Sequence, residues 1–201
     1  MKIYTVILLS MIIILSGCSN ISNKKIENSK KNIQWIEMKG GETYLDLQSG
    51  DIIIKERQNN TLGLFGHSAI MFDERIVYDY PKLGEKSYAV DIDYWLEKDR
   101  KILILRYKNM TDEFRTKLLE NMKKYFGKKY EISSNKNNTD GFYCSQYIWY
   151  VYYITAKELG YELDLDSDGG KYIFPYDFIN SSFLNIIYWF FSNFRVRYWY
   201  R

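Results

Sequence analysis

The sequence predicts an α+β domain with an antiparallel sheet, because strand-like segments come first and helical segments follow. Short apolar runs separated by turn residues occupy the stretch from about Leu47 to Tyr107. From Thr111 the apolar residues recur at helical spacing, and a second helix-length segment begins at Cys144. There is no internal repeat and no sign of a second domain, so we expect one globular domain.

Turn residues divide the strand region into short elements. Leu47–Asp51 is a turn before the first strand, and Asp73–Arg75 closes a hairpin. The predicted strands are Ile52–Ile54, His67–Phe72, Ile76–Tyr80, Tyr88–Ile92, Lys101–Tyr107 and the aromatic run Phe183–Phe191.

Two helices are predicted from capping residues and apolar spacing. Thr111 can cap a helix that ends at Gly127, and Gly160 stops a helix that spans Cys144–Leu159. The apolar positions of the first helix are Phe114, Leu118, Leu119, Met122 and Phe126. Asn135–Gly141 is a polar loop between the helices, and Pro175 begins a turn.

The first 17 residues are typical of an export signal. Met1 and Lys2 precede an apolar run, Ile3–Leu15, which is too short to span a bilayer comfortably. The ending Leu15-Ser16-Gly17-Cys18 resembles a bacterial lipobox, which implies that Cys18 carries a diacylglycerol and becomes the mature N-terminus. An ordinary secretory signal with a chance cysteine is the alternative.

The predicted organisation therefore has three parts: a lipoprotein signal peptide at 1–17, a lipidated tether at 18–40 and a globular domain at 41–201. The tether is rich in Ser, Asn and Lys and poor in apolar residues. We expect a protein of the bacterial cell envelope, held by lipid on the extracytoplasmic side of a membrane.

Composition excludes several function classes. A net charge of +3, with charges of both signs spread along the chain, gives no support for nucleic-acid binding. The sequence indicates no cofactor and no obligate protein partner. The 20 tyrosines and 11 phenylalanines predict an aromatic core or an aromatic groove.

No metal site is predicted. One histidine and one cysteine outside the signal are too few for zinc. Asp164, Asp166 and Asp168 imitate the start of a calcium loop, but the twelfth position is Pro175, where a bidentate Glu is needed. We interpret this segment as an acidic turn.

One histidine and one cysteine form the candidate catalytic pair. Cys144 has no intramolecular partner once Cys18 is lipidated, and an unpaired thiol in an exported protein suggests reactivity. His67 is the only imidazole that could take its proton. A buried, inert cysteine and a structural histidine are the alternatives.

The predicted position of Cys144 at a helix start favours nucleophilic chemistry. Partial positive charge and free N–H groups there lower a thiol pKa and can bind an oxyanion. Tyr143 could add a phenolic donor, and Ser145 and Gln146 are polar residues that could reach the site.

The hairpin suggests the third member. With a three-residue loop, Asp79 pairs with Ala69 and lies diagonally across from His67, within side-chain reach. A two-residue loop would instead bring Tyr78 and Tyr80 onto that face. We expect Asp79 to orient the imidazole, with Tyr80 as the alternative.

The order of these motifs resembles a known family. The segments are Gly50–Ile53, Gly66–Ile70, Val77–Asp79, Phe142–Gln146 with Trp149, Leu163–Asp166 and Pro175–Asp177. Together they are similar to the circularly permuted papain-like amidases, the YiiX/YycO-like branch of the NlpC-type cell-wall hydrolase superfamily. In these proteins the histidine strand precedes the cysteine helix.

The resemblance implies a permuted papain-like fold and a Cys–His–acid site at Cys144, His67 and Asp79, although the family's acid is commonly Glu. We therefore expect a membrane-anchored cysteine hydrolase that cleaves amide bonds, with peptidoglycan stem peptides or related peptides as substrates. The alternatives are a lipid acyltransferase, thioesterase or lipid amidase using the same residues, and a catalytically silent binding protein.

Overall fold

The computed structural model describes residues 33–37, 46–59, 64–96 and 100–187. The chain divides into two compact units, Met1–Gln34 and Trp35–Arg201, and the description below concerns the second. The predicted signal peptide and Cys18 lie outside the described residues, as does most of the tether. Within the described ranges, the structure contains no helix whose length and apolar character would suit a membrane crossing.

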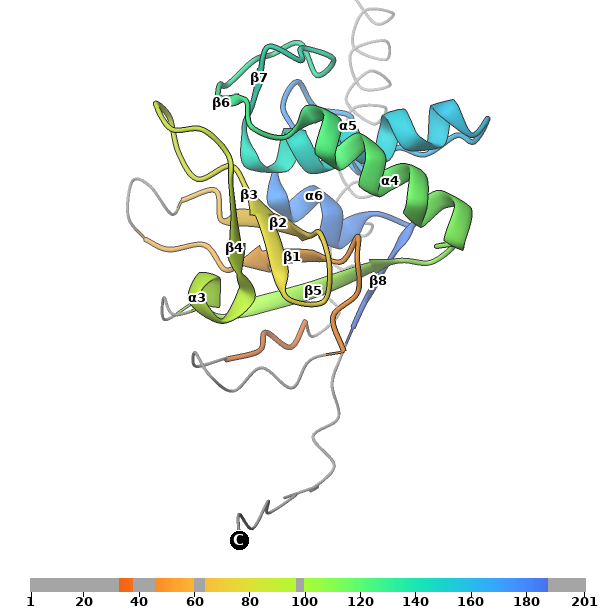
Figure 1. The fold of residues 1–201 in the computed structure, drawn as a ribbon. Coiled ribbons are helices and arrows are strands. Elements are labelled where there is room, and N and C mark those ends of the chain that lie inside the picture. Colours follow the sequence, from red (N-terminus) through yellow and green to blue (C-terminus); the bar gives the residue numbers. More distant parts are fainter. Residues whose placement is uncertain (1–32, 38–45, 60–63, 97–99, 188–201) are drawn as a thin grey trace, which may run out of the picture. The chain divides into compact units, whose positions relative to one another are not determined.

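One six-stranded sheet is the centre of the unit, in the order β4-β3-β2-β1-β5-β8 (Figure 1). Each neighbouring pair is antiparallel, which confirms the predicted sheet type. The strands are β1 (Ile52–Lys55), β2 (His67–Met71), β3 (Ile76–Asp79), β4 (Tyr88–Asp91), β5 (Ile102–Tyr107) and β8 (Leu184–Ile186). Of the predicted last strand, residues 188–191 lie outside the described ranges.

Four helices are described: α3 (Ile92–Leu96), α4 (Asp112–Tyr125), α5 (Cys144–Glu158) and α6 (Pro175–Asn180). A separate parallel pair, β6 (Lys129–Tyr130) and β7 (Gly141–Phe142), flanks the polar loop before α5. The two long helices begin where the sequence predicted.

Two local predictions were wrong. Ile92 was expected to end a strand, but it begins α3, where the Asp91 carboxylate accepts the N–H of Asp93. Pro175 was expected to begin a turn, but it starts α6, and the Asp177 carboxylate accepts the N–H of Phe174 at the entry to that helix. In both cases a carboxylate satisfies a backbone donor at the start of a short helix.

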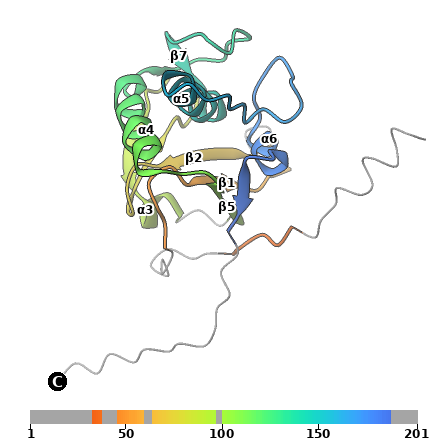
Figure 2. The ribbon, with the colours of Figure 1, turned by 90° about the vertical axis from the view of Figure 1, so that its right-hand side faces the viewer.

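The sheet is covered on both faces (Figures 1 and 2). α5 packs against β2, and α4 packs against α5, on one face. On the other face, α3 closes a second apolar layer over the sheet. The second layer contains Leu47, Ile53, Ala69, Met71, Val77, Ile92, Trp95, Leu96, Ile102 and Ile104. Because β1 lies between these layers, its three isoleucines are fully buried.

Aromatic side chains fill much of the space under the long helices, which confirms the predicted aromatic core. The buried tyrosines also satisfy their hydroxyl groups, as buried polar groups must. Tyr80 donates to the Tyr125 carbonyl at 2.7 Å, Tyr147 to Met122 at 2.8 Å and Tyr152 to Gly50 at 2.6 Å. These bonds tie α5 and β3 to α4 and to the turn before β1.

The hairpin register agrees with the predicted three-residue loop. Ile70 pairs with Tyr78 and Met71 pairs with Val77, and the Phe72 N–H donates to the Ile76 carbonyl at 2.7 Å. The Asp73 carboxylate accepts the N–H of Ile76 at 2.7 Å and so holds the turn. This register places the side chain of Asp79 on the same face of the sheet as His67.

The cap of α4 can be tested by substitution at Thr111. Its hydroxyl oxygen accepts the Phe114 N–H at 3.1 Å, so Thr111→Ala should lower the free energy of unfolding by about 1 kcal/mol. Urea denaturation measures this change. Thr111→Ser keeps the hydroxyl and serves as the control; equal stability of the Ala and Ser variants would contradict the capping role.

Candidate active site

His67 is positioned by a glycine that the local geometry requires. Gly66 has a φ of +76°, a conformation that favours glycine. A Cβ at this position would lie 3.0 Å from the Tyr176 ring and 3.1 Å from the Lys55 carbonyl oxygen. The backbone therefore has a left-handed conformation at Gly66, directly before β2, and His67 is the first residue of that strand.

The imidazole of His67 contacts the carboxylate of Asp79. Nε2 lies 2.8 Å from Oδ1, and the side chain of Asp79 is buried. The structure thus brings together the histidine and the acid that the hairpin register predicted. The Tyr80 hydroxyl is directed instead to the Tyr125 carbonyl, so the alternative partner is not the one found at His67.

Two side chains that the sequence analysis missed hold the other oxygen of Asp79. Trp95 donates through Nε1 at 2.8 Å, and Tyr88 donates through its hydroxyl at 3.0 Å, both to Oδ2. The Trp95 ring also stacks on His67, with ring centroids 6.0 Å apart. The predicted strand ended at Ile92 and no element was predicted for the rest of α3, which carries Trp95, so this contact had no local signal in the sequence.

Lys55 also contacts Trp95. It is the register partner of His67 across β1 and β2. Its ammonium group lies 3.6 Å from the Trp95 ring centroid and donates to the Trp95 carbonyl. The ring of Trp95 therefore contacts both His67 and Lys55, which limits the positions available to Asp79.

Cys144 occupies the first turn of α5, as predicted. Tyr143 is the N-cap residue, and the first bond of the helix runs from the Tyr147 N–H to the Tyr143 carbonyl at 3.0 Å. The N–H groups of residues 144 to 146 precede that bond and are the donors that a helix start leaves without an intrahelical acceptor. The free thiol of Cys144 is therefore beside partial positive charge.

His67 and Cys144 form a coupled pair in which each group stabilises the charge of the other. Burial alone would lower the pKa of His67, but the charges of Asp79 and Cys144, with hydrogen bonds to both, raise it to about 10. Burial alone would raise the pKa of the Cys144 thiol, but the His67 charge and hydrogen bond lower it. Because Nε2 is engaged by Asp79, Nδ1 is the nitrogen available to the sulfur.

The sulfur also meets the backbone of β2. The N–H and carbonyl of Met71 bond to the β1 side, so the even-numbered residues of β2 point their backbone groups toward β3. Continued pairing would set Ser68 opposite Tyr80, but the paired register ends at Ile70 and Tyr78. A hydrogen bond from the Ser68 backbone to Cys144 instead lowers the pKa of the thiol.

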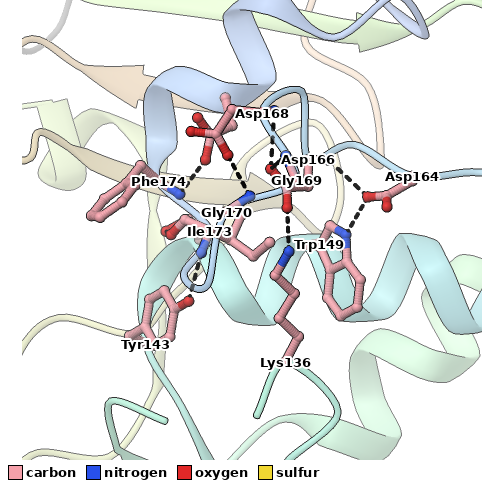
Figure 3. Close-up of polar contacts among 12 residues, drawn as sticks. Lys136, Tyr143, Trp149, Asp164, Asp166, Asp168, Gly169, Gly170, Ile173 and Phe174 are labelled. Atoms are coloured by element: carbon pink, nitrogen blue, oxygen red, sulfur yellow. Dashed lines mark hydrogen bonds and ion pairs between the residues drawn. The ribbon is translucent and has the colours of Figure 1, made fainter. Parts of the chain in front are cut away.

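The polar residues around Cys144 hold the flanking loops, and Figure 3 shows the contact between Tyr143 and Ile173. The Tyr143 hydroxyl accepts the Ile173 N–H, and Ser145 donates to the Ile173 carbonyl, each at 2.8 Å. Gln146 donates to backbone carbonyls of the polar loop, including that of Lys136 at 3.2 Å. Their expected roles in oxyanion or substrate binding remain predictions.

Tyr130 is a further neighbour that the sequence analysis did not single out. The parallel pairing of β6 and β7 sets it opposite Phe142, two residues before Cys144. Burial raises the pKa of Tyr130 well above 10, and the charges of Cys144, Tyr143 and Asp79 raise it further. The phenol therefore keeps its proton near the nucleophile.

Among the described residues, one group of carboxylates could hold a metal ion, and it includes two aspartates of the acidic loop. Carboxylate oxygens of Asp166, Asp168 and Asp177 lie within 4.8 Å of one another. Lys136 is ion-paired with Asp166, and backbone N–H groups of the loop bond to Asp166 and Asp168 (Figure 3). Burial raises the pKa of Asp177 to about 6. These contacts are those of an acidic turn whose carboxylates are bonded to backbone N–H groups of the same turn and to Lys136.

The fold and the site define a mixed α/β protein with a mostly antiparallel sheet and a largely buried Cys–His–Asp cluster. One solved structure with this fold is metalloprotein YiiX of Escherichia coli O157:H7, with a TM-score of 0.54 and 17% identity. The match covers 72% of this chain and 98% of that chain. No protein-family model and no curated protein matches the chain.

The likeness to YiiX supports the fold part of the predicted resemblance, since the YiiX-like branch was the one that the motifs indicated. At this identity it carries the fold alone.

The state of the thiol can be tested by alkylation. A free cysteine with a pKa of about 8.5 is roughly 0.3% thiolate at pH 6, so its reaction with iodoacetamide is slow. Cys144 should react more than tenfold faster than glutathione at this pH.

His67→Ala removes the charge that lowers the thiol pKa and leaves the burial that raises it. The rate at pH 6 should then fall at least tenfold, with the pH midpoint moving to 8.5 or above.

The role of Asp79 can be tested with the same reagent. Asp79→Asn removes the charge that raises the His67 pKa, so alkylation at pH 6 should slow severalfold, and Asp79→Ala should slow it further. Tyr80→Phe is the matched control because its hydroxyl contacts the Tyr125 carbonyl. Circular dichroism should show that the variants are folded. Equal rates in Asp79→Ala and wild type would exclude the acid from the site.

Proposed function

We propose that this protein is a membrane-anchored cysteine hydrolase that cleaves amide bonds in the bacterial cell envelope through an acyl-enzyme on Cys144. The observation that carries the proposal is the bonding of His67 to both Asp79 and the Cys144 sulfur. A nucleophile, a base and a group that orients the base form the minimal apparatus for this chemistry.

The first half of the reaction forms the acyl-enzyme. The Cys144 thiolate attacks the carbonyl carbon, a C–S bond forms, and the oxygen becomes negative. Backbone N–H groups at the start of α5 are suitable donors for that oxyanion. The Tyr143 hydroxyl is a second candidate, since its oxygen accepts a bond from Ile173 and that bond does not use its hydrogen.

Collapse of the intermediate breaks the C–N bond, and the His67 imidazolium donates its proton to the departing amine. Water then attacks the thioester while the neutral imidazole takes the proton of the water. The C–S bond breaks, the acid product leaves, and the thiolate–imidazolium pair returns. Asp79 keeps the imidazole in position throughout and stabilises its positive charge whenever it is protonated.

The proposed substrates are stem peptides of peptidoglycan or related peptides. The envelope location expected from Cys18 and the resemblance to permuted papain-like amidases support this choice, and the fold shared with YiiX is consistent with it. The lipid on Cys18 would keep the enzyme at the membrane surface, where wall peptides are accessible.

A lipid acyl substrate is the second candidate, and one feature of the surface favours it. Leu64 and Phe65 are 55% and 56% exposed, and they directly precede the Gly66-His67 step into the site. Phe65 also stacks on Phe174, at a centroid distance of 5.5 Å. An exposed apolar surface beside His67 suits an acyl chain. In this second candidate reaction, Cys144 would be the nucleophile for transfer or hydrolysis of a lipid acyl group.

The two substrates can be separated by product analysis. The purified protein should be incubated with peptidoglycan and, separately, with phospholipid vesicles, and the products identified by mass spectrometry. We expect new amine and carboxyl ends in stem peptides. Free fatty acid or a transferred acyl group would establish the lipid reaction instead.

Cys144→Ala is the essential control for both incubations, and it should abolish the product because no other group supplies the acyl acceptor. A product that persists in this variant would contradict the proposal. Binding of either substrate without any product would identify a catalytically silent binding protein.

A further inference from the structure

Arg100 is a half-buried cation beside the candidate active site that the proposed mechanism does not use. It lies at the entry to β5. Its Nε donates to the Glu56 carbonyl at 3.0 Å, and one terminal nitrogen donates to the same oxygen. Glu56 directly follows Lys55, which pairs with His67 across the sheet. The guanidinium is therefore held at Glu56, the residue after the strand partner of His67.

Arg100 lies near Tyr176, whose ring packs against Gly66. The Tyr176 hydroxyl accepts the Arg57 N–H at 3.0 Å, and the Arg57 guanidinium lies 3.9 Å from the Tyr176 ring centroid. The same ring would touch a Cβ at Gly66. Arg100 shares electrostatic interactions with Tyr176, with Cys144 and with Glu56. Both arginines are thus linked to Tyr176, whose ring lies against Gly66, the residue before His67.

The Glu56 charge favours the cation of Arg100, but it does not form an ion pair with the guanidinium. Burial lowers its pKa, which shows that the surroundings oppose the cation. In the part of the chain that the structure describes, no carboxylate forms an ion pair with it, and its two bonds go to one neutral carbonyl. A guanidinium has five N–H donors in a planar fork, and its remaining donors suit a carboxylate.

We propose that Arg100 recognises a carboxylate on the substrate and holds it close to the carbonyl that Cys144 attacks. This inference rests on the proposed function and narrows its substrate class to acyl compounds with a free carboxylate near the scissile bond, such as short peptides. Arg100 acts here as a specificity residue, since it binds substrate and takes no part in proton transfer.

A pair of alkylating reagents tests the proposal without a known substrate. Iodoacetate and iodoacetamide deliver the same carbon to a thiolate, but only iodoacetate carries a carboxylate. The rate constant of each is measured on the full chain in neutral detergent, from the mass of the peptide that contains Cys144. Arg100→Gln should slow iodoacetate at least fivefold and change iodoacetamide by less than twofold, and Arg100→Lys should lie between.

Arg75→Gln is the matched control. It removes the same charge from the hairpin at the other end of β2, where Arg75 pairs with Asp91. This variant should leave both rate constants unchanged. An equal slowing of both reagents in Arg100→Gln would show that the arginine only supports the fold, and an unchanged ratio would likewise overturn the proposal.

A binding measurement makes the result independent of thiol reactivity. In the Cys144→Ala chain, N-acetyl-alanyl-alanine should bind at least fivefold more tightly than its carboxamide, and Arg100→Gln should remove the difference. Equal binding, or binding of neither peptide, would overturn the proposal. An unreactive Cys144 would instead count against the hydrolase, while the difference between the two peptides would still report on Arg100.

Discussion

The contact between His67 and Asp79 is the constraint on which the rest of the site depends. It exists because a three-residue loop sets the hairpin register, which places both side chains on one face of the sheet. A register shifted by one residue would turn the carboxylate to the opposite face. Without the negative charge of Asp79, the pKa of the imidazole would fall, and the thiol would lose part of the positive charge that favours its ionised form.

The end of strand pairing between β2 and β3 admits the nucleophile. His67 lies on the α3 face of the sheet, whereas α5 covers the opposite face. The two meet where the ladder stops after Ile70 and Tyr78, so that the Ser68 backbone can bond to Cys144. The charge of His67 lowers the pKa of the thiol, and the start of a helix, where Cys144 lies, is a position that favours a thiolate.

Around this centre, the fold uses buried polar groups to fix positions. Trp95 and Tyr88 donate to one oxygen of Asp79, and Lys55 packs on the ring of the same tryptophan. Tyr143 and Ser145 both hold Ile173. The candidate site is thus supported by residues from strands, helices and loops that are distant in the sequence, which is the arrangement expected of a preorganised site.

Local patterns were sufficient to predict the strands of the main sheet, the two long helices, the capped start of α4 and the placement of Cys144 at a helix start, because these depend on neighbours within a few residues. The hairpin loop length also led to Asp79. The short helix α3 and its tryptophan could not be predicted, since a five-residue helix carries little periodic signal. Only packing between distant segments decides that Trp95 reaches Asp79, that Tyr130 lies near Cys144, and that the sulfur meets the strand of His67. Those contacts depend on how the chain folds back over the sheet, which no local pattern encodes.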